Sequence, residues 1–221
     1  MFVKRVIIPS SFCPTPFYFA LLHTSLFEVI IDYSGYFYKQ TFRNRANVLS
    51  SQGVKSLVVP VVGGRKYGVP LKNIKIDYSE NWIHKHLKSL ETYYYSSPFY
   101  EIVIDDITKL YNKNFVFLWE LNKSFINYFT ELLSLEKNFI ENFDNQIKCN
   151  DNDCIDLRKI YSPKRKYLDK FKNLTYTKYY QLYHTNKIEF HSELSVFDIV
   201  FNTGAEAGMI IRKMFDNFLN K

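Results

Sequence analysis

The segment "FVKRVIIPSSFCPTPFYFALLHTSLFEVIID" (residues 2–32) decides the fold class of this chain. Its first part, residues 2–9, is short and rich in β-branched side chains, which is typical of a strand. Residues 15–24 follow with Pro16 in what would be a first helical turn, where the missing N–H of proline costs little. Residues 26–32 again have the composition of a strand. The segment therefore predicts a β-strand, a helix and a second β-strand in succession.

The rest of the chain divides into a strand-rich part and a helical part. Three more strands are expected early, at residues 36–42, 54–61 and 73–77. Beyond Asn81 the apolar residues recur at helical spacing, and helices are expected to begin near residues 81, 98, 117, 194 and 206, the third of them continuing towards residue 143. The prediction is a mixed α/β fold, with a small βαβ-containing sheet within about residues 1–77 followed by a largely helical C-terminal part.

Length and composition indicate one globular domain. The chain has 221 residues and a mass of 26.4 kDa, and 47% of its residues are hydrophobic, which is enough for a well-buried core. We therefore expect a single domain over residues 1–221. The polar segment 144–154 is either an exposed loop or a boundary between subregions.

Charge and cysteine content indicate the kind of partner and compartment. The formal charge is +7, which favours anionic partners such as phosphates, nucleotides or nucleic acid. No apolar run reaches the roughly 18–20 residues of a membrane span, and the N-terminal stretch is too short and proline-broken for a signal peptide. Three cysteines in a chain of this size predict no disulfide framework. A cytoplasmic protein is the resulting expectation.

Common cofactor and catalytic motifs are absent from the sequence. It contains no P-loop, no dinucleotide-binding glycine motif after the first strand and no nucleophile elbow. Cys149 and Cys154 would need His184 and His191 to complete a zinc site, and we consider that combination less favoured than no metal. No cofactor is predicted.

Basic residues gather in three stretches: residues 37–45, "GGRKYG" (63–68) and "SPKRKYLDKFK" (162–172). If residues 37–45 form a strand, Lys39, Arg43 and Arg45 share one face. Those cations then form either one wall of an anion pocket or a charged edge strand that resists aggregation. The other two stretches are compatible with phosphate binding and also with a loop and a solvated helix face.

Seven blocks of the sequence resemble the WbqC-like protein family, in the family's order. They are "KQTFRNR" (39–45), "VPV" (59–61), "IDYSENW" (76–82) with His86, "YYSSPFYE" (94–101), "LRKIYSPK" (157–164), "YYQLY" (179–183) and "LSVFDIVFNTG" (194–204). The resemblance spans nearly the whole chain. One departure lies near the N-terminus, where Phe17 in "FCPTPFYF" stands where the family has a glutamine.

The resemblance implies a role in the biosynthesis of bacterial surface polysaccharide of the O-antigen type. The implied activity is a transferase that moves an aminoacyl or acyl group, such as glycyl, to a nucleotide-activated amino sugar. An aminoacyl-tRNA is one potential donor, and the positive charge of the chain would then have a use.

Candidate site residues follow by position from the resemblance. His86 and Asp198 are the candidate general bases, and Lys39, Arg43 and Arg45 would hold a pyrophosphate. Asp198 interrupts an apolar stretch, so if buried it needs a partner, and Arg43, Arg45 or Arg158 is expected to supply it. The complete set of expected substrate-binding residues is Lys39, Gln40, Arg43, Asn44, Arg45, Asp77, Arg158, Gln181 and Asn202. By contrast, Trp82, Tyr94 and Pro98 are expected to pack in the core.

Two alternatives to the transferase stay open at this point. The first is a non-catalytic protein that binds a nucleotide sugar or another anion within a biosynthetic assembly. It shares the cationic pocket, and it differs in not needing His86 or Asp198 near that pocket. The second is a nucleic-acid binder, which requires the basic residues of 39–45 and 162–172 on one continuous exposed face.

Overall fold

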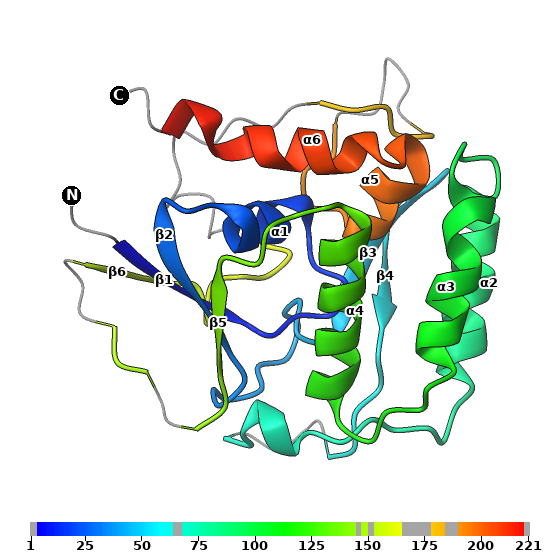
Figure 1. The fold of residues 1–221 in the computed structure, drawn as a ribbon. Coiled ribbons are helices and arrows are strands. Elements are labelled where there is room, and N and C mark those ends of the chain that lie inside the picture. Colours follow the sequence, from blue (N-terminus) through cyan, green and yellow to red (C-terminus); the bar gives the residue numbers. More distant parts are fainter. Residues whose placement is uncertain are drawn as a thin grey trace.

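The computed structural model describes residues 4–63, 68–144, 147–149, 153–164, 178–183 and 190–218 of the chain. Within them, strands and helices form a mixed α/β fold, as the sequence predicted (Figure 1). The basic stretch 162–172 and the loop 63–68 lie largely outside the described residues, and so does His184.

The predicted βαβ unit forms the centre of a parallel sheet. Strand β1 (Lys4–Pro9) pairs in parallel with β2 (Phe27–Asp32), with Val6 opposite Val29. Helix α1 (Pro16–His23) connects them and begins with the expected proline. Every residue of α1 up to Leu22 is buried, because the later helix α6 (Glu206–Arg212) lies beside it (Figure 1).

Two strands that the sequence did not predict complete this sheet. Strand β5 (Phe139–Asn142) pairs with β2, strand β6 (Cys154–Asp156) pairs with β1, and all pairs are parallel, giving the order β5-β2-β1-β6. The expectation that the third helix continues towards residue 143 is therefore wrong. Helix α4 (Leu118–Leu132) ends because Ser134 has a φ of 50°, which a right-handed helix does not allow.

A separate β-hairpin follows the basic stretch 37–45. Strands β3 (Arg45–Ser50) and β4 (Gly53–Val58) are antiparallel, and Gly53 at their turn has a φ of 97°. The strands expected at 36–42 and 73–77 are not formed. Residues 39–44 are a turn, in which Gln40 has a φ of 57°, and the 3₁₀ segment Leu71–Asn73 is followed by isolated bridges at Lys75 and Ile76. Side-chain alternation therefore does not apply to the basic stretch before Arg45.

The helical part agrees with the apolar periodicity. Helices α2 (Trp82–Tyr94), α3 (Tyr100–Tyr111) and α4 follow one another, with α2 and α3 side by side in Figure 1. Their apolar stripes are buried, including Trp82 and Tyr94 as expected, whereas the expectation that Pro98 packs in the core is wrong, because Pro98 is exposed. The remaining helical elements are α5 (Val196–Thr203), α6, and the 3₁₀ segments η1 (Leu71–Asn73) and η3 (Lys213–Phe218).

Gly204 separates α5 from α6, as the sequence indicated. Its φ is 54°, and a Cβ atom at this position would lie 2.5 Å from a ring carbon of Phe99. Both the backbone conformation and the space therefore require glycine.

The cysteines require a correction. A disulfide bond joins Cys149 to Cys154, so one pair is cross-linked although no disulfide framework was expected. Both sulfurs are used in that bond, which removes them from any zinc site. Cys13 is a free and fully buried thiol. In the part of the chain that the structure describes, no helix is long and apolar enough to cross a membrane.

Candidate functional site

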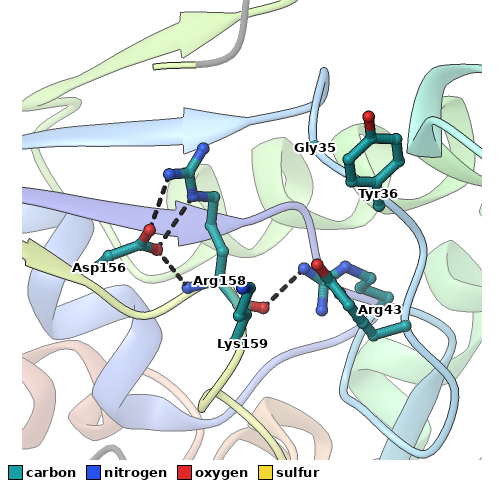
Figure 2. A pocket seen from close by; sticks show the side chains of 7 residues that line it. Gly35, Tyr36, Arg43, Asp156, Arg158 and Lys159 are labelled. Carbon is teal, nitrogen blue, oxygen red and sulfur yellow. Dashed lines mark hydrogen bonds and ion pairs between the residues drawn. The ribbon is translucent and has the colours of Figure 1, made fainter. Parts of the chain in front are cut away.

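A pocket of about 240 Å³ opens at the carboxyl ends of the parallel strands. Strands β2 and β5 lie on one side of β1 within the sheet, and β6, which follows them in the chain, lies on the other side of β1. In open α/β sheets, ligands bind outside the carboxyl ends of the strands at such a change of direction. The lining residues come from the segment after β2 and from the end of β6: Gly35, Tyr36, Tyr38, Arg43, Asp156, Arg158 and Lys159 (Figure 2).

Arg43 is a buried cation in this pocket. Its side chain is 1% exposed, its Nη1 donates to Thr41 Oγ1 at 3.3 Å, and its Nη2 donates to the backbone carbonyl of Arg158 at 2.7 Å. The guanidinium carbon also lies 4.9 Å from the ring centroid of Tyr38. Among the described residues, no acceptor lies within hydrogen-bond distance of Arg43 Nε, and no carboxylate lies within ion-pair distance of the guanidinium.

The charge of Arg43 persists in this environment. Burial lowers its pKa to about 10, while the carboxylates of Asp32 and Asp156 act in the opposite direction. A pKa of about 10 leaves the guanidinium protonated at neutral pH. The turn at 39–44 therefore places a positive charge, unpaired with any described carboxylate, against a pocket, and an anionic ligand is the partner that such a charge favours.

Arg158, in contrast, is already neutralised. Its Nη1 donates to Asp32 Oδ2 at 2.9 Å, and its Nε and Nη2 donate to the two oxygens of Asp156 at 3.0 and 2.7 Å. Nη2 also donates to the carbonyl of Ile147 at 2.9 Å. Figure 2 shows the guanidinium of Arg158 facing the carboxylate of Asp156. The hydrogen bonds to Asp156, followed by the contact with Asp32, raise the pKa of Arg158 further.

Asp32 organises the pocket wall, and sequence reasoning missed it. Its Oδ1 accepts hydrogen bonds from the backbone N–H groups of Ser34 and Gly35, from Ser34 Oγ and from Asn142 Nδ2, at 2.6–3.2 Å. Burial acts to raise its pKa, but the hydrogen bonds from Ser34, Arg158 and Asn142 outweigh that effect and lower it. The available signal was an acidic residue at the end of an apolar strand, just before Ser34 and Gly35.

A second polar cluster lies around Asp198, the candidate base in α5. Asp198 is fully buried, and its carboxylate accepts hydrogen bonds from Tyr94 Oη at 2.9 Å, Tyr179 Oη at 2.7 Å and Gln181 Nε2 at 3.3 Å. Burial raises the pKa of Asp198 to about 6, although these three donors counteract the increase. The expectation of an arginine partner is wrong, because among the described residues two hydroxyls and an amide take that place.

His86, the other candidate base, packs between α2, α3 and β4. Its Nε2 lies 3.1 Å from the carbonyl of Val58, and its Nδ1 lies 3.2 Å from Tyr111 Oη. The simplest assignment has Nε2–H donating to Val58 and Nδ1 accepting from Tyr111. Burial lowers the pKa of His86 to about 4, so the ring is neutral at physiological pH.

Comparison with known proteins gives a family match. Residues 10–210 match the family model described as the WbqC-like protein family. The chain belongs to the WbqC-like protein family. No curated protein and no solved structure matches it significantly. The resemblance carried by the seven sequence blocks is thereby confirmed.

The structure of this WbqC-like family member brings only some of the expected substrate-binding residues together. Arg43 and Arg158 meet in the pocket, whereas Gln181 joins Asp198 and holds the backbone of His191 through both ends of its amide. Asn202 donates to the Asp198 carbonyl at 2.8 Å and accepts from Ser97 Oγ at 3.1 Å. These four expected residues thus divide between the pocket and the Asp198 cluster.

The other expected residues are not among those that line the pocket. Lys39 and Gln40 are exposed in the turn, and Asn44 donates to the carbonyl of Val59 at 2.8 Å. Arg45 begins β3, and Asp77 accepts a hydrogen bond from the N–H of Ser79 at 2.9 Å. Among the described residues, no group of three or more His, Cys, Asp or Glu side chains could hold a metal ion.

Proposed function

We propose that this WbqC-like protein binds a nucleotide-activated sugar in the Arg43 pocket, as part of bacterial surface-polysaccharide biosynthesis. The observation that carries the proposal is the buried guanidinium of Arg43, which lines the pocket and has no ion-pair partner among the described residues. The biosynthetic role is what membership of the family implies.

Charge in the pocket supports a phosphate-bearing ligand. Lys159 is exposed at the pocket and, like Arg43, makes no ion pair with any described residue. A guanidinium with unused donor capacity can hold two phosphate oxygens at once, and the ammonium of Lys159 adds a flexible point charge. Together the two cations match a diphosphate better than a neutral sugar.

Aromatic side chains support a nucleotide rather than inorganic phosphate. Tyr36 lines the pocket with 40% of its surface exposed, and Tyr38, two residues further along the chain, lines it too. An exposed aromatic ring at a cationic pocket offers a stacking surface for a nucleobase. We assign Tyr36 to the base and Arg43 with Lys159 to the phosphates.

If the protein is an enzyme, the reaction we propose is acyl transfer to an amine of the bound sugar. It requires a base within hydrogen-bond reach of the amine. His86 and Asp198 do not line the pocket, and their polar atoms are bonded to other groups of the protein. This arrangement favours the binding or assembly function over catalysis by these two side chains.

The test is calorimetric titration with a uridine diphosphate-activated amino sugar, the free nucleoside diphosphate and tRNA. Arg43→Gln should weaken binding of the first two ligands roughly 10–100-fold, since a hydrogen bond to a charged group contributes about 1.5–3 kcal/mol. Arg45→Gln is the matched control, because Arg45 follows in the same stretch outside the pocket lining. Binding of tRNA alone, or equal affinities in the two variants, would contradict the proposal.

A second measurement separates binding from transfer. The protein is incubated with the nucleotide sugar and an aminoacyl-tRNA or acyl thioester, and the sugar is analysed by mass spectrometry. The wild-type protein would be a transferase if it formed an acylated sugar. Loss of that product in His86→Gln or Asp198→Asn, with binding unchanged, would identify the substituted side chain as the base. No acylated product, with binding intact, agrees with the binding function.

A further inference from the structure

The disulfide between Cys149 and Cys154 lies directly beside the Arg158 wall of the pocket. Cys154 is the first residue of β6, and Asp156, which holds Arg158 by three hydrogen bonds, is the last. On the other side of the bond, Ile147 precedes Cys149 by two residues, and its carbonyl accepts from Arg158 Nη2 at 2.9 Å. The bond thus links two of the three segments that hold the Arg158 guanidinium, the third being the end of β2 at Asp32.

Among the described residues, β6 is held mainly through β1, and the N–H of Leu157 just after it donates to the carbonyl of Ile7. Strand β6 is three residues long, and in the part of the chain that the structure describes it lies at the edge of the sheet and pairs with β1 alone, where Arg5 is opposite Cys154. The backbone N–H of Arg5 also donates to the carbonyl of Asp153. A short edge strand opens locally at a lower free energy than the core strands, so a covalent tether has a large local effect there.

Both cysteines of the bond are accessible enough to react. Cys149 and Cys154 are half-buried, whereas the third cysteine, Cys13, is 0% exposed. The two bonded residues are five positions apart, and a loop this short restricts the unfolded chain less than a long one. Reduction should therefore change the pocket wall without unfolding the protein.

We infer that Cys149 and Cys154 form a thiol–disulfide site that controls ligand affinity at the pocket, with the oxidised form binding more tightly. The co-reactant is a dithiol. One of its thiolates attacks the disulfide and releases one cysteine as a thiolate, which takes a proton. The second thiol of the co-reactant then displaces the other cysteine. Two electrons and two protons pass to the cysteines, and the dithiol becomes a disulfide.

The effect reaches the ligand through Arg158. With the tether open, the Ile147 carbonyl and β6 no longer hold the guanidinium rigidly, and the Arg158 backbone carbonyl that accepts from Arg43 loses its fixed place. Arg43 is the cation assigned to the ligand, so this inference rests on the proposed function. The expected result of reduction is about tenfold weaker binding, comparable to the loss of one charged hydrogen bond.

The experiment compares oxidised protein, protein reduced with dithiothreitol, and the double variant Cys149→Ser/Cys154→Ser. Thiol titration in denaturant should give one thiol per chain before reduction and three after it, since the chain has 3 cysteines. Pyrophosphate and the uridine diphosphate sugar are then titrated into each form. We expect the reduced protein and the double variant to bind about tenfold more weakly than the oxidised protein, and reductant to leave the variant unchanged.

Amide hydrogen exchange distinguishes failure of this inference from failure of the proposed function. Reduction should speed exchange in β6 and at Leu157–Lys159, and leave α4 unchanged. If neither ligand binds any form, the proposed function fails, and faster exchange in these residues then supports only a thiol–disulfide site that loosens the pocket wall. Equal ligand affinities in the oxidised and reduced proteins, or exchange that does not respond to reduction, would overturn the inference.

Discussion

Arg43 and Arg158 are two cations joined by a hydrogen bond, in which Arg43 Nη2 donates to the backbone carbonyl of Arg158 at 2.7 Å. Their side chains nevertheless have opposite environments. Arg158 is held by two carboxylates, whereas Arg43 contacts a hydroxyl, a carbonyl and an aromatic ring. Two arginines that look alike in the sequence thus differ: Arg158 belongs to a structural ion-pair network, and Arg43 has no ion pair among the described residues.

Replacing Asp32 by asparagine should destabilise the protein by about 3–5 kcal/mol, because it leaves part of the charge of Arg158 without its buried partner. Urea unfolding measures the change. Asp106→Asn is the control, since Asp106 pairs with Lys109 on the surface and its loss should cost less than about 1 kcal/mol. Equal effects of the two substitutions would show that the Asp32 pair does not hold the pocket wall.

The buried carboxyl of Asp198 should make the protein less stable as pH rises from about 4 to 6. Its folded pKa of about 6 lies above the ordinary value of 3.8, so in this window the folded state binds the extra proton. In Asp198→Asn this contribution, on the order of 2–3 kcal/mol, disappears. Free energies of unfolding at pH 4.5 and 7 should therefore rise more steeply with pH in the variant than in wild type.

His86 should have the opposite pH dependence. Its folded pKa of about 4 lies below the ordinary value of 6.5, so the unfolded state binds more protons and stability rises between about pH 4 and 6.5. In wild type the two contributions largely cancel. His86→Gln should remove the increase, so that unfolding free energy falls with pH over this range. A variant whose pH profile matches wild type would show that His86 is not a buried neutral ring.

Gly204→Ala should destabilise the protein more than Gly53→Ala. Both glycines have positive φ, but a Cβ at Gly53 meets no atom within 4 Å, whereas one at Gly204 would collide with Phe99. Each substitution carries a backbone cost, and Gly204→Ala adds the collision, which should cost about 1–3 kcal/mol more. Thermal unfolding of both variants measures it. If Gly53→Ala were the more damaging, the packing of Phe99 against the α5 terminus would be contradicted.

Local sequence patterns predicted the elements whose residues carry their own signal. Pro16 and the apolar run after it gave α1, and helical spacing of apolar residues gave α2, α3 and the start of α4. Strands β5 and β6 escaped prediction because they are four and three residues long and partly polar. Their strand character comes from pairing with β2 and β1, which no local pattern encodes.

Of the substrate-binding residues expected from the sequence, only two line the pocket. Arg43 and Arg158 were both named from the sequence, and both line the pocket. The strand assumed for residues 37–45 placed Arg43 and Arg45 on one face, whereas the turn at Gln40 sends only Arg43 to the pocket. The role of Asp32 depends on Asn142 and Arg158, which are more than 100 positions away in the chain.

The sequence by itself determined the α/β class, the family and the presence of several cations, because these follow from periodicity, composition and residue identity over short windows. Only the tertiary structure decided which cation stays without an ion pair. That outcome depends on which carboxylates lie near each cation in the folded chain. Asp32 and Asp156, at the ends of two different strands, both pair with Arg158, whereas Arg43 lines the pocket without an ion pair to a described residue. Electrostatic pairing is a property of distances in space, which residues far apart in the chain acquire only on folding.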